Sequence, residues 1–290
     1  MTNISDSDNT FQSSTEAEST EAYQATQYPL RRIIPPEFYY RLRTFNRRYP
    51  WLFLPQARWR WQRWRKQYGF DNDSLEPAAP YPLDRSTEIT IEAYPRCGNT
   101  FAHIAFKFAQ QQPVSIAHHT HAAAQVIGSV KQKIPTLVII RPPQDAICSY
   151  LAGGFDPGLT VKQALREYIS FYSLILPYKS DFVVATFEQI TQDFGAIIRS
   201  VNQTYGTNFD EFEHTEANVN KCFDLIDRGY EEAFGTLSNK VVSRPATERS
   251  SLKNSVKEQY NCSKYSQLKN KANQIYQQLL ETSSTAQNQG

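Results

Sequence analysis

The strongest constraint on the fold is an alternation of short β-rich runs and helical patterns that begins near Ser86. Such alternation is typical of a parallel sheet whose strands are joined by crossover helices. The predicted strands are 89–94, 114–117, 136–140 and 182–186, and the predicted helices are 100–111, 143–151, 160–178 and 187–205. Beyond them we expect helix to about Glu281, with an interruption near 235–251. The sequence therefore predicts an α/β domain with a central parallel sheet flanked by helices.

Composition divides the 290 residues into four parts. Residues 1–30 carry five acids, no base and few apolar side chains, which predicts a disordered acidic tail. The other parts are a basic, aromatic-rich extension and linker at 31–85, the α/β domain at 86–281 and a frayed tail at 282–290. The four cysteines are scattered, and no run of about 18 apolar residues occurs. These features favour a cytoplasmic protein without a membrane span.

The loop after the first predicted strand joins that strand to a helix and reads Tyr94-Pro95-Arg96-Cys97-Gly98-Asn99-Thr100-Phe101. The unpaired N–H groups and positive dipole end of a helix start suit a phosphate or a sulfate. Arg96 adds a permanent charge, and Thr100 adds a hydroxyl. Asn99 stands where a Walker A motif has its lysine, which counts against an ATP-dependent kinase.

A second segment repeats this arrangement after the strongly apolar third strand. Arg141 ends that strand, and Ser149 follows two helical turns later, so the two side chains can reach one phosphate. The pattern also allows a structural ion pair between Arg141 and Asp145. Both segments follow the carboxyl ends of predicted parallel strands, which is the edge where ligands of open α/β sheets bind.

Together these segments resemble the PAPS-dependent sulfotransferases, a family with a P-loop NTPase-like fold. The first is similar to the family's 5′-phosphosulfate loop, usually Pro-Lys-Ser-Gly-Thr-Thr-Trp, and the second to its 3′-phosphate element, in which Arg-(Asp/Asn)-Pro precedes a helix ending in Ser-Tyr. The resemblance implies transfer of a sulfuryl group from 3′-phosphoadenosine-5′-phosphosulfate (PAPS) to a hydroxyl or an amine. It implies a phosphosulfate site at Arg96, Cys97, Gly98, Asn99, Thr100 and Phe101, and a 3′-phosphate site at Arg141 and Ser149.

A histidine-rich stretch, Ala117-His118-His119-Thr120-His121, lies between the two segments. The family has Lys-Thr-His here, so the resemblance implies His121 as the catalytic base and His119 in the lysine's place beside the leaving group. Arg96 replaces the loop's usual lysine and is expected to stabilise the same negative charge. A metal site at His119 and His121 and a plain surface cluster are alternatives, and no metal is expected. No carboxylate base is evident from the sequence.

The family also closes over the nucleotide with a basic loop near the C-terminus. The resemblance implies Arg244 as a second contact to the 3′-phosphate, with Arg249 as the alternative. The acceptor, whether glycan, lipid or small molecule, is not set by the sequence. Two other functions stay open, a P-loop-like phosphotransferase that uses ATP and Mg²⁺, and an inactive module that binds nucleotide or docks to a membrane.

Residues 31–66 contain eleven bases, one acid and all four tryptophans. Arginine and tryptophan in helices favour the interface of an anionic membrane, which would make the protein peripheral. The same residues would also suit a polyanionic acceptor, and nucleic acid is the least favoured partner. The third interpretation is an extension that packs its tryptophans on the α/β domain and leaves its arginines in water.

Overall fold

The computed structural model describes residues 34–68, 80–154, 156, 158–234 and 249–287. The predicted acidic tail, the central part of the linker and Arg244 lie outside these residues. The described chain contains a four-stranded parallel sheet with strand order β2-β1-β3-β4. The strands are β1 (Ile89–Ala93), β2 (Ile116–His118), β3 (Thr136–Ile140) and β4 (Val183–Thr186). The predicted α/β fold with a central parallel sheet is confirmed.

The two central strands are buried on both faces. Every residue of β1 and β3 is buried, as expected for parallel strands covered by helices on each side. In the sheet register Ala93 lies opposite Ile139, so both strands end at the same edge. The chain passes from β1 outward to β2 and then crosses back to β3, which makes the β1–β3 boundary the point where the strand order reverses.

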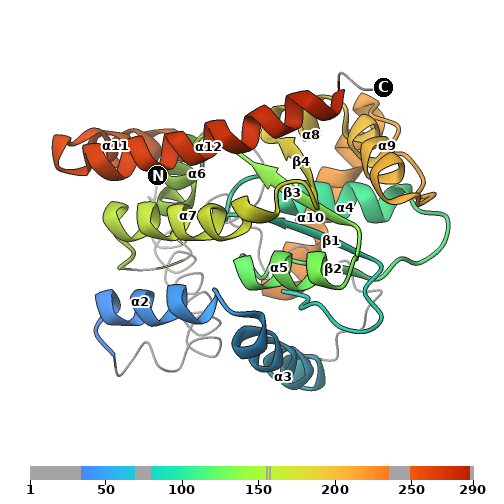
Figure 1. The fold of residues 1–290 in the computed structure, drawn as a ribbon, viewed down its shortest axis with the longest axis horizontal. Helices are drawn as coiled ribbons and strands as arrows, with labels where there is room; N and C mark the ends of the chain where they lie inside the picture. The colour runs from blue at the N-terminus through green and yellow to red at the C-terminus, as the bar shows by residue number, and fades with distance from the viewer. Residues whose placement is uncertain (1–33, 69–79, 155, 157, 235–248, 288–290) are drawn as a thin grey trace, which may run out of the picture.

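Helices cover both faces of this sheet (Figure 1). One face is covered by α5 (Ala123–Lys131), α7 (Val161–Ile175) and α12 (Ser266–Gln287). The other is covered by α4 (Asn99–Ala109) and α9 (Phe194–Tyr205), and α10 (Glu216–Phe234) packs on α4. The remaining elements near the sheet are α6 (Pro143–Ala152), α8 (Phe187–Gln192), α11 (Arg249–Asn261) and the 3₁₀ turns Leu176–Tyr178 and Ser263–Tyr265.

Side-chain caps decide where several helices begin. The predicted Thr160 cap is present, and it forms a capping box with Gln163 at the start of α7. The single helix expected over 187–205 is wrong, because the chain breaks at Asp193 into α8 and α9. Asp193 has the non-helical angles φ −153° and ψ 82°, and its carboxylate accepts from Ala196 N–H to cap α9.

Two other helices depart from expectation. The sequence pattern predicts no element where the structure has α5, a short helix with Gly128 in its middle. A Cβ at Gly128 would lie 3.0 Å from both Leu54 and Leu83, so the glycine serves close packing although it weakens the helical pattern. At the C-terminus, α12 runs to Gln287 and does not fray at Glu281.

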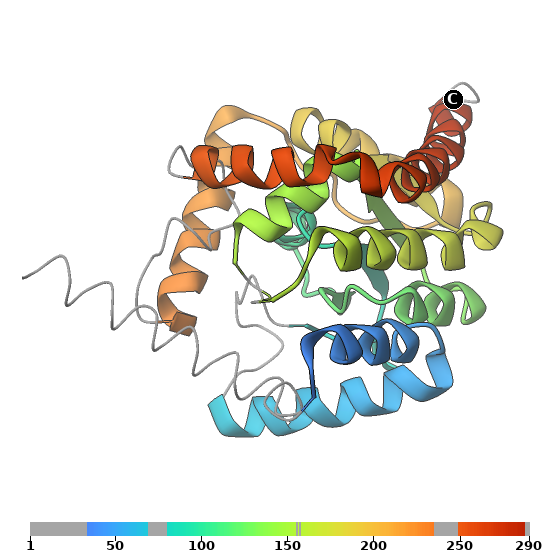
Figure 2. The same ribbon diagram turned by 90° about the vertical axis from the view of Figure 1, so that its left-hand side faces the viewer.

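The basic extension folds as two helices, α2 (Pro36–Asn46) and α3 (Pro50–Tyr68), which we call the N-terminal arm. Both views place the arm along one edge of the molecule (Figures 1 and 2). Its inner side packs Phe53, Leu54 and Ala57 of α3 around Leu83. No helix in the described ranges is long and apolar enough to cross a bilayer.

Candidate functional site

The loop between β1 and α4 has the backbone shape of an anion site. Arg96 (φ 67°) and Gly98 (φ 94°) both take the left-handed conformation, which turns neighbouring N–H groups toward one side. A Cβ at position 98 would lie 2.5 Å from Ile190 Cδ1, so only glycine lets α8 pack this close. Gly98, the N-cap residue of α4, has no side chain with which to cap the helix, so the loop meets the positive end of the α4 dipole through its backbone.

The second predicted segment meets this loop directly. Arg141 Nη1 donates to the carbonyl oxygen of Arg96 at 2.9 Å, and Arg96 Nε donates to Ser149 Oγ at 3.4 Å. The Arg141 guanidinium also lies 4.0 Å above the ring of Phe187. The ion pair of Arg141 with Asp145 is not formed among the described residues. Arg96, Arg141 and Ser149 are all half-buried, so the cluster reaches solvent at the edge where β1 and β3 end.

Two residues of the predicted loop site turn their side chains into the core instead. Cys97 is fully buried, its sulfur lies 3.6 Å from the Tyr172 hydroxyl, and burial raises the pKa of its thiol to about 12. Phe101 packs against the rings of Phe194, Phe212 and Phe223. Any contribution of these two residues to ligand binding is limited to their backbone N–H groups.

The other two loop residues link the loop to the histidine-rich stretch. The Thr100 hydroxyl lies 3.1 Å from His119 Nε2. The Asn99 amide bridges Ile91 and His119, donating to the Ile91 carbonyl (3.1 Å) and accepting from His119 N–H (3.2 Å). The predicted positions of the loop and of His119 are therefore physically connected. His119 itself is buried, which lowers the pKa of its imidazole well below the usual value.

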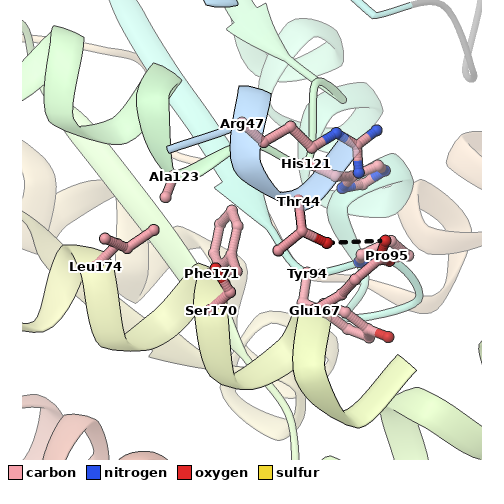
Figure 3. Close-up of a pocket in the computed structure, with 10 residues that line it drawn as sticks. All are labelled: Thr44, Arg47, Tyr94, Pro95, His121, Ala123, Glu167, Ser170, Phe171 and Leu174. Carbon is pink, nitrogen blue, oxygen red and sulfur yellow. Dashed lines mark hydrogen bonds between the residues drawn. The ribbon is translucent and has the colours of Figure 1, made fainter. Parts of the chain in front are cut away.

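His121 lies at the side of a small pocket between α2, α5 and α7 (Figure 3). Its Nδ1 is 2.7 Å from the Ala93 carbonyl, which can only accept, so Nδ1 carries the proton and Nε2 keeps a lone pair. Burial lowers the pKa of His121 to about 4, with smaller effects from Arg47 and Arg43. Thr44, Arg47, Pro95 and Phe171 also line the pocket, whose interior of about 20 Å³ has room for about one water molecule.

A buried carboxylate, Glu92, which is not among the residues predicted from the sequence, holds this histidine loop in place. Glu92 Oε1 accepts from the backbone N–H and hydroxyl of Thr120 (2.7 and 2.8 Å) and from Gln125 (2.9 Å). Its Oε2 accepts from the N–H groups of Ala93 and His121, both at 3.2 Å, and lies 4.0 Å from His121 Nδ1. Burial raises the pKa of Glu92 to about 7. An acid inside the apolar run Ile89-Thr90-Ile91-Glu92-Ala93 was the signal in the sequence.

His119 and His121 do not share an extended face, as the metal alternative required. Both have positive φ, at 56° and 49°, and their ring centroids are 5.8 Å apart. A different group has ring nitrogens within 4.8 Å of one another, namely His103, His118 and His119. However, the rings of His103 and His118 stack at 3.7 Å, so their in-plane lone pairs lie in separate, nearly parallel planes and do not meet at one point. We assign no metal ion to this group.

The fold is that of an α/β protein whose β1–α4 loop, at the switch point of the sheet, has the backbone geometry of an anion site. Two arginines, a left-handed glycine loop and an uncapped helix start come together there. No family model matches the chain, and no curated protein matches it. Among solved structures, the chain is similar to mouse sulfotransferase SULT7A1 complexed with PAP, with a TM-score of 0.36 and 12% identity over 68% of this chain and 92% of that one. A likeness this distant assigns neither family nor substrate.

Proposed function

We propose that this protein is a PAPS-dependent sulfotransferase that acts on a hydroxyl or an amine. The observation that carries the proposal is the contact between the two anion-binding segments, Arg141 to Arg96 at 2.9 Å and Arg96 to Ser149 at 3.4 Å. The two segments come from separate strands, and their side chains meet where open α/β sheets bind nucleotides. The sequence resemblance of both segments to the family's phosphate sites supports the same function.

The two phosphate-bearing ends of PAPS fit the two halves of this cluster. The phosphosulfate oxygens would accept hydrogen bonds from the backbone N–H groups of residues 97–100 and lie beside the guanidinium of Arg96. Arg141 and Ser149 would bind the 3′-phosphate, and Phe187 supports the Arg141 guanidinium from below. Arg244 remains a proposed further contact, and it lies outside the described residues.

The chemistry is an in-line transfer with His121 as the base. The acceptor oxygen or nitrogen forms a bond to sulfur, while the bond from sulfur to the bridging phosphate oxygen breaks. The electron pair of the broken bond leaves with the 5′-phosphate, and Arg96 stabilises that charge. The acceptor's proton moves to His121 Nε2, the ring nitrogen that the Ala93 hydrogen bond leaves unprotonated.

His119 and Glu92 fit supporting roles in this reaction. His119 bonds the Thr100 hydroxyl, so it positions the first turn of α4 from beneath the loop. Glu92 fixes the backbone of residues 120 and 121 and orients the base. We propose both as positioning residues, because neither lines the pocket beside His121.

Turnover with a panel of hydroxyl and amine acceptors tests the proposal. Release of 3′-phosphoadenosine-5′-phosphate (PAP) from PAPS is followed for the wild type and for His121→Ala. Loss of a general base typically lowers kcat by about 10²- to 10⁴-fold, and we expect PAP affinity to stay unchanged. His214→Asn is the matched control, because His214 accepts the Phe194 N–H and packs its ring beside Phe101 and Phe212, and it does not line the pocket beside His121.

Competing functions give different results in the same assay. A phosphotransferase would consume ATP with Mg²⁺ and ignore PAPS. An inactive nucleotide-binding module would bind PAP but turn over no acceptor, and His121→Ala would then change nothing. Either pattern contradicts the proposal.

A cytoplasmic location is part of the proposal and rests on cysteine chemistry. All four cysteines, Cys97, Cys148, Cys222 and Cys262, are free, as expected in a reducing compartment.

A further inference from the structure

The outer side of the N-terminal arm carries a concentration of exposed apolar side chains. Within the described residues, most large exposed hydrophobics belong to this arm, which contributes Phe38, Leu42, Phe45, Tyr49, Trp51 and Trp59. Trp51 is 74% exposed and Trp59 60%. A surface helix normally turns such residues inward, so an outward row of them marks an interaction surface.

Five of these side chains follow one another in a row, and Trp59 lies about two turns beyond Trp51 on the same helix. Phe38, Leu42 and Phe45 repeat at helical spacing along α2. The rings of Phe45 and Tyr49 are 5.4 Å apart, and those of Tyr49 and Trp51 are 6.1 Å apart, which carries the stripe into α3. We call this set of six residues, Phe38 to Trp59, the apolar stripe.

Positive charge borders the apolar stripe on both helices. The exposed bases of the arm are Arg41, Arg48, Arg60, Arg63 and Lys66. Glu37, which pairs with Arg41 at 3.4 Å, is the single acid in residues 31–66. Arg63 lies over the ring of Trp59 at 5.7 Å, so apolar and basic groups share one surface.

The inner side of the same helices is firmly packed, so the apolar stripe is not an unfinished core. Arg43 is buried on the inner side of α2, where it donates to Glu167 of α7 (2.7 Å) and to Asp156 (2.7 Å). Tyr40 beside it is 1% exposed. The arm is thus held by its inner face and presents a fixed outer face.

We propose that the apolar stripe and its bordering bases dock the protein onto an anionic lipid bilayer. A helix face of aromatic and aliphatic groups flanked by arginine and lysine fits the boundary between headgroups and acyl chains. A nucleic acid would use the bases but leave Phe38, Leu42 and Phe45 in water. A second copy of the chain, meeting stripe to stripe, would bring like charges together.

Docking in this orientation has a consequence for the pocket beside His121. Thr44 and Arg47, which line the pocket, project from the inner side of α2, so the pocket lies directly behind the docked helix. If the proposed sulfotransferase function holds, an acceptor that resides in the membrane would reach the base along the arm. The docking test itself requires no turnover, so it stands or fails independently of the enzymatic activity.

Co-sedimentation of the full chain with lipid vesicles tests the docking. We expect vesicles of phosphatidylcholine and phosphatidylserine to bind the protein at least about tenfold better than phosphatidylcholine alone. High salt should reverse this gain because it screens the bases. Trp51→Ser should lower partitioning about tenfold, and Arg48→Glu should remove most of the preference for phosphatidylserine.

Matched controls separate docking from general effects of substitution. Leu252→Ser removes an exposed hydrophobic of α11, and Lys179→Glu reverses an exposed charge after α7; both should bind vesicles like the wild type. Circular dichroism checks that each variant is folded. Absence of binding to anionic vesicles, or equal loss in the control variants, overturns the proposal. So does a stripe-dependent dimer, or RNA binding without vesicle binding.

Discussion

Arginines at the sheet edge and arginines on the N-terminal arm show how placement gives one residue type different uses. At the edge, Arg96 and Arg141 are half-buried and fixed by hydrogen bonds to Ser149 and to the Arg96 carbonyl. On the arm, Arg48 and Arg63 are exposed and border an apolar surface. Arg43, on the same helix as the apolar stripe, is buried between two carboxylates.

The difference lies in how many directions each guanidinium is allowed to take. Edge arginines held in one orientation can bind one anion of defined shape, because little ordering entropy is lost on binding. Exposed arm arginines keep their rotamer freedom and suit a diffuse array of charges such as a lipid surface. We therefore expect the sheet edge to select one anionic ligand, and the arm to place the protein at a lipid surface.

The largest expected effect concerns the fixed inner side of the arm. Arg43→Met removes the guanidinium that pairs with the buried carboxylates of Glu167 and Asp156. We expect the free energy of unfolding to fall by about 3–5 kcal/mol. Arg41→Met on the same helix removes only an exposed pair and should change it by about 0.5 kcal/mol or less. Urea unfolding measures both. Equal stability of the two variants would mean that the inner face does not hold the arm.

At the sheet edge, the proposed base His121 depends on Glu92 for its orientation. Glu92→Gln keeps the shape of the side chain but places an amide nitrogen against N–H donors of residues 93 and 121. We expect kcat to fall about a hundredfold while PAP affinity and KM for the acceptor stay unchanged. Glu88→Gln, at an exposed site one residue before β1, is the control. A parallel loss of PAP affinity would indicate a collapsed edge and would contradict a positioning role.

Low pH should destabilise the region of the sheet edge more than the arm, because buried histidines lie near that edge and the described arm contains no histidine. Burial lowers the pKa of His103 to about 3, and its Nδ1 has no hydrogen-bond partner among the described residues. In the unfolded chain this histidine has a pKa of about 6.5. Below that pH the unfolded chain binds a proton that the folded chain excludes, so the free energy of unfolding decreases as the pH is lowered. At pH 5 this costs about 2 kcal/mol for His103.

The check is urea unfolding at pH 7 and pH 5. The wild type should lose stability on acidification, and His103→Leu should lose about 2 kcal/mol less. Glu92, with its pKa raised to about 7, acts in the opposite direction but is present in both proteins. An identical loss in the two proteins would show that His103 is not buried in its neutral form.

The strands of the fold could be predicted because their residues leave few choices. The segment Thr136–Ile140 is apolar after its first residue and bounded by loops, and it forms β3 with the expected limits. The helix α5 was not predicted, since Gly128 weakens its helical pattern and the close approach of Leu54 and Leu83 that favours glycine there exists only in the tertiary structure. Tyr81, assigned to the linker, is buried and pairs with His118, a contact that only the tertiary structure provides.

The residues of the candidate site could be predicted from the sequence, but the hydrogen bonds between them could not. Arg96, Arg141 and Ser149 could be named from their places after two strands. That Ser149 would bond Arg96, and that Arg141 would bond the Arg96 backbone, depends on the left-handed turn at positions 96 and 98. Glu92 was missed because an isolated acid in a strand gives no indication of the five donors that the folded chain directs at it.

The central claim is a PAP-binding edge built from two separate segments, and calorimetric titration with PAP tests it most directly. Wild-type protein should bind PAP, and Arg141→Ala should weaken that affinity about 10- to 100-fold, because a charge-assisted bond to phosphate is lost. Arg48→Ala on the arm should bind as the wild type does, and ATP with Mg²⁺ should not compete. Folded wild-type protein that fails to bind PAP, or an Arg141→Ala variant that binds it equally well, would contradict the account.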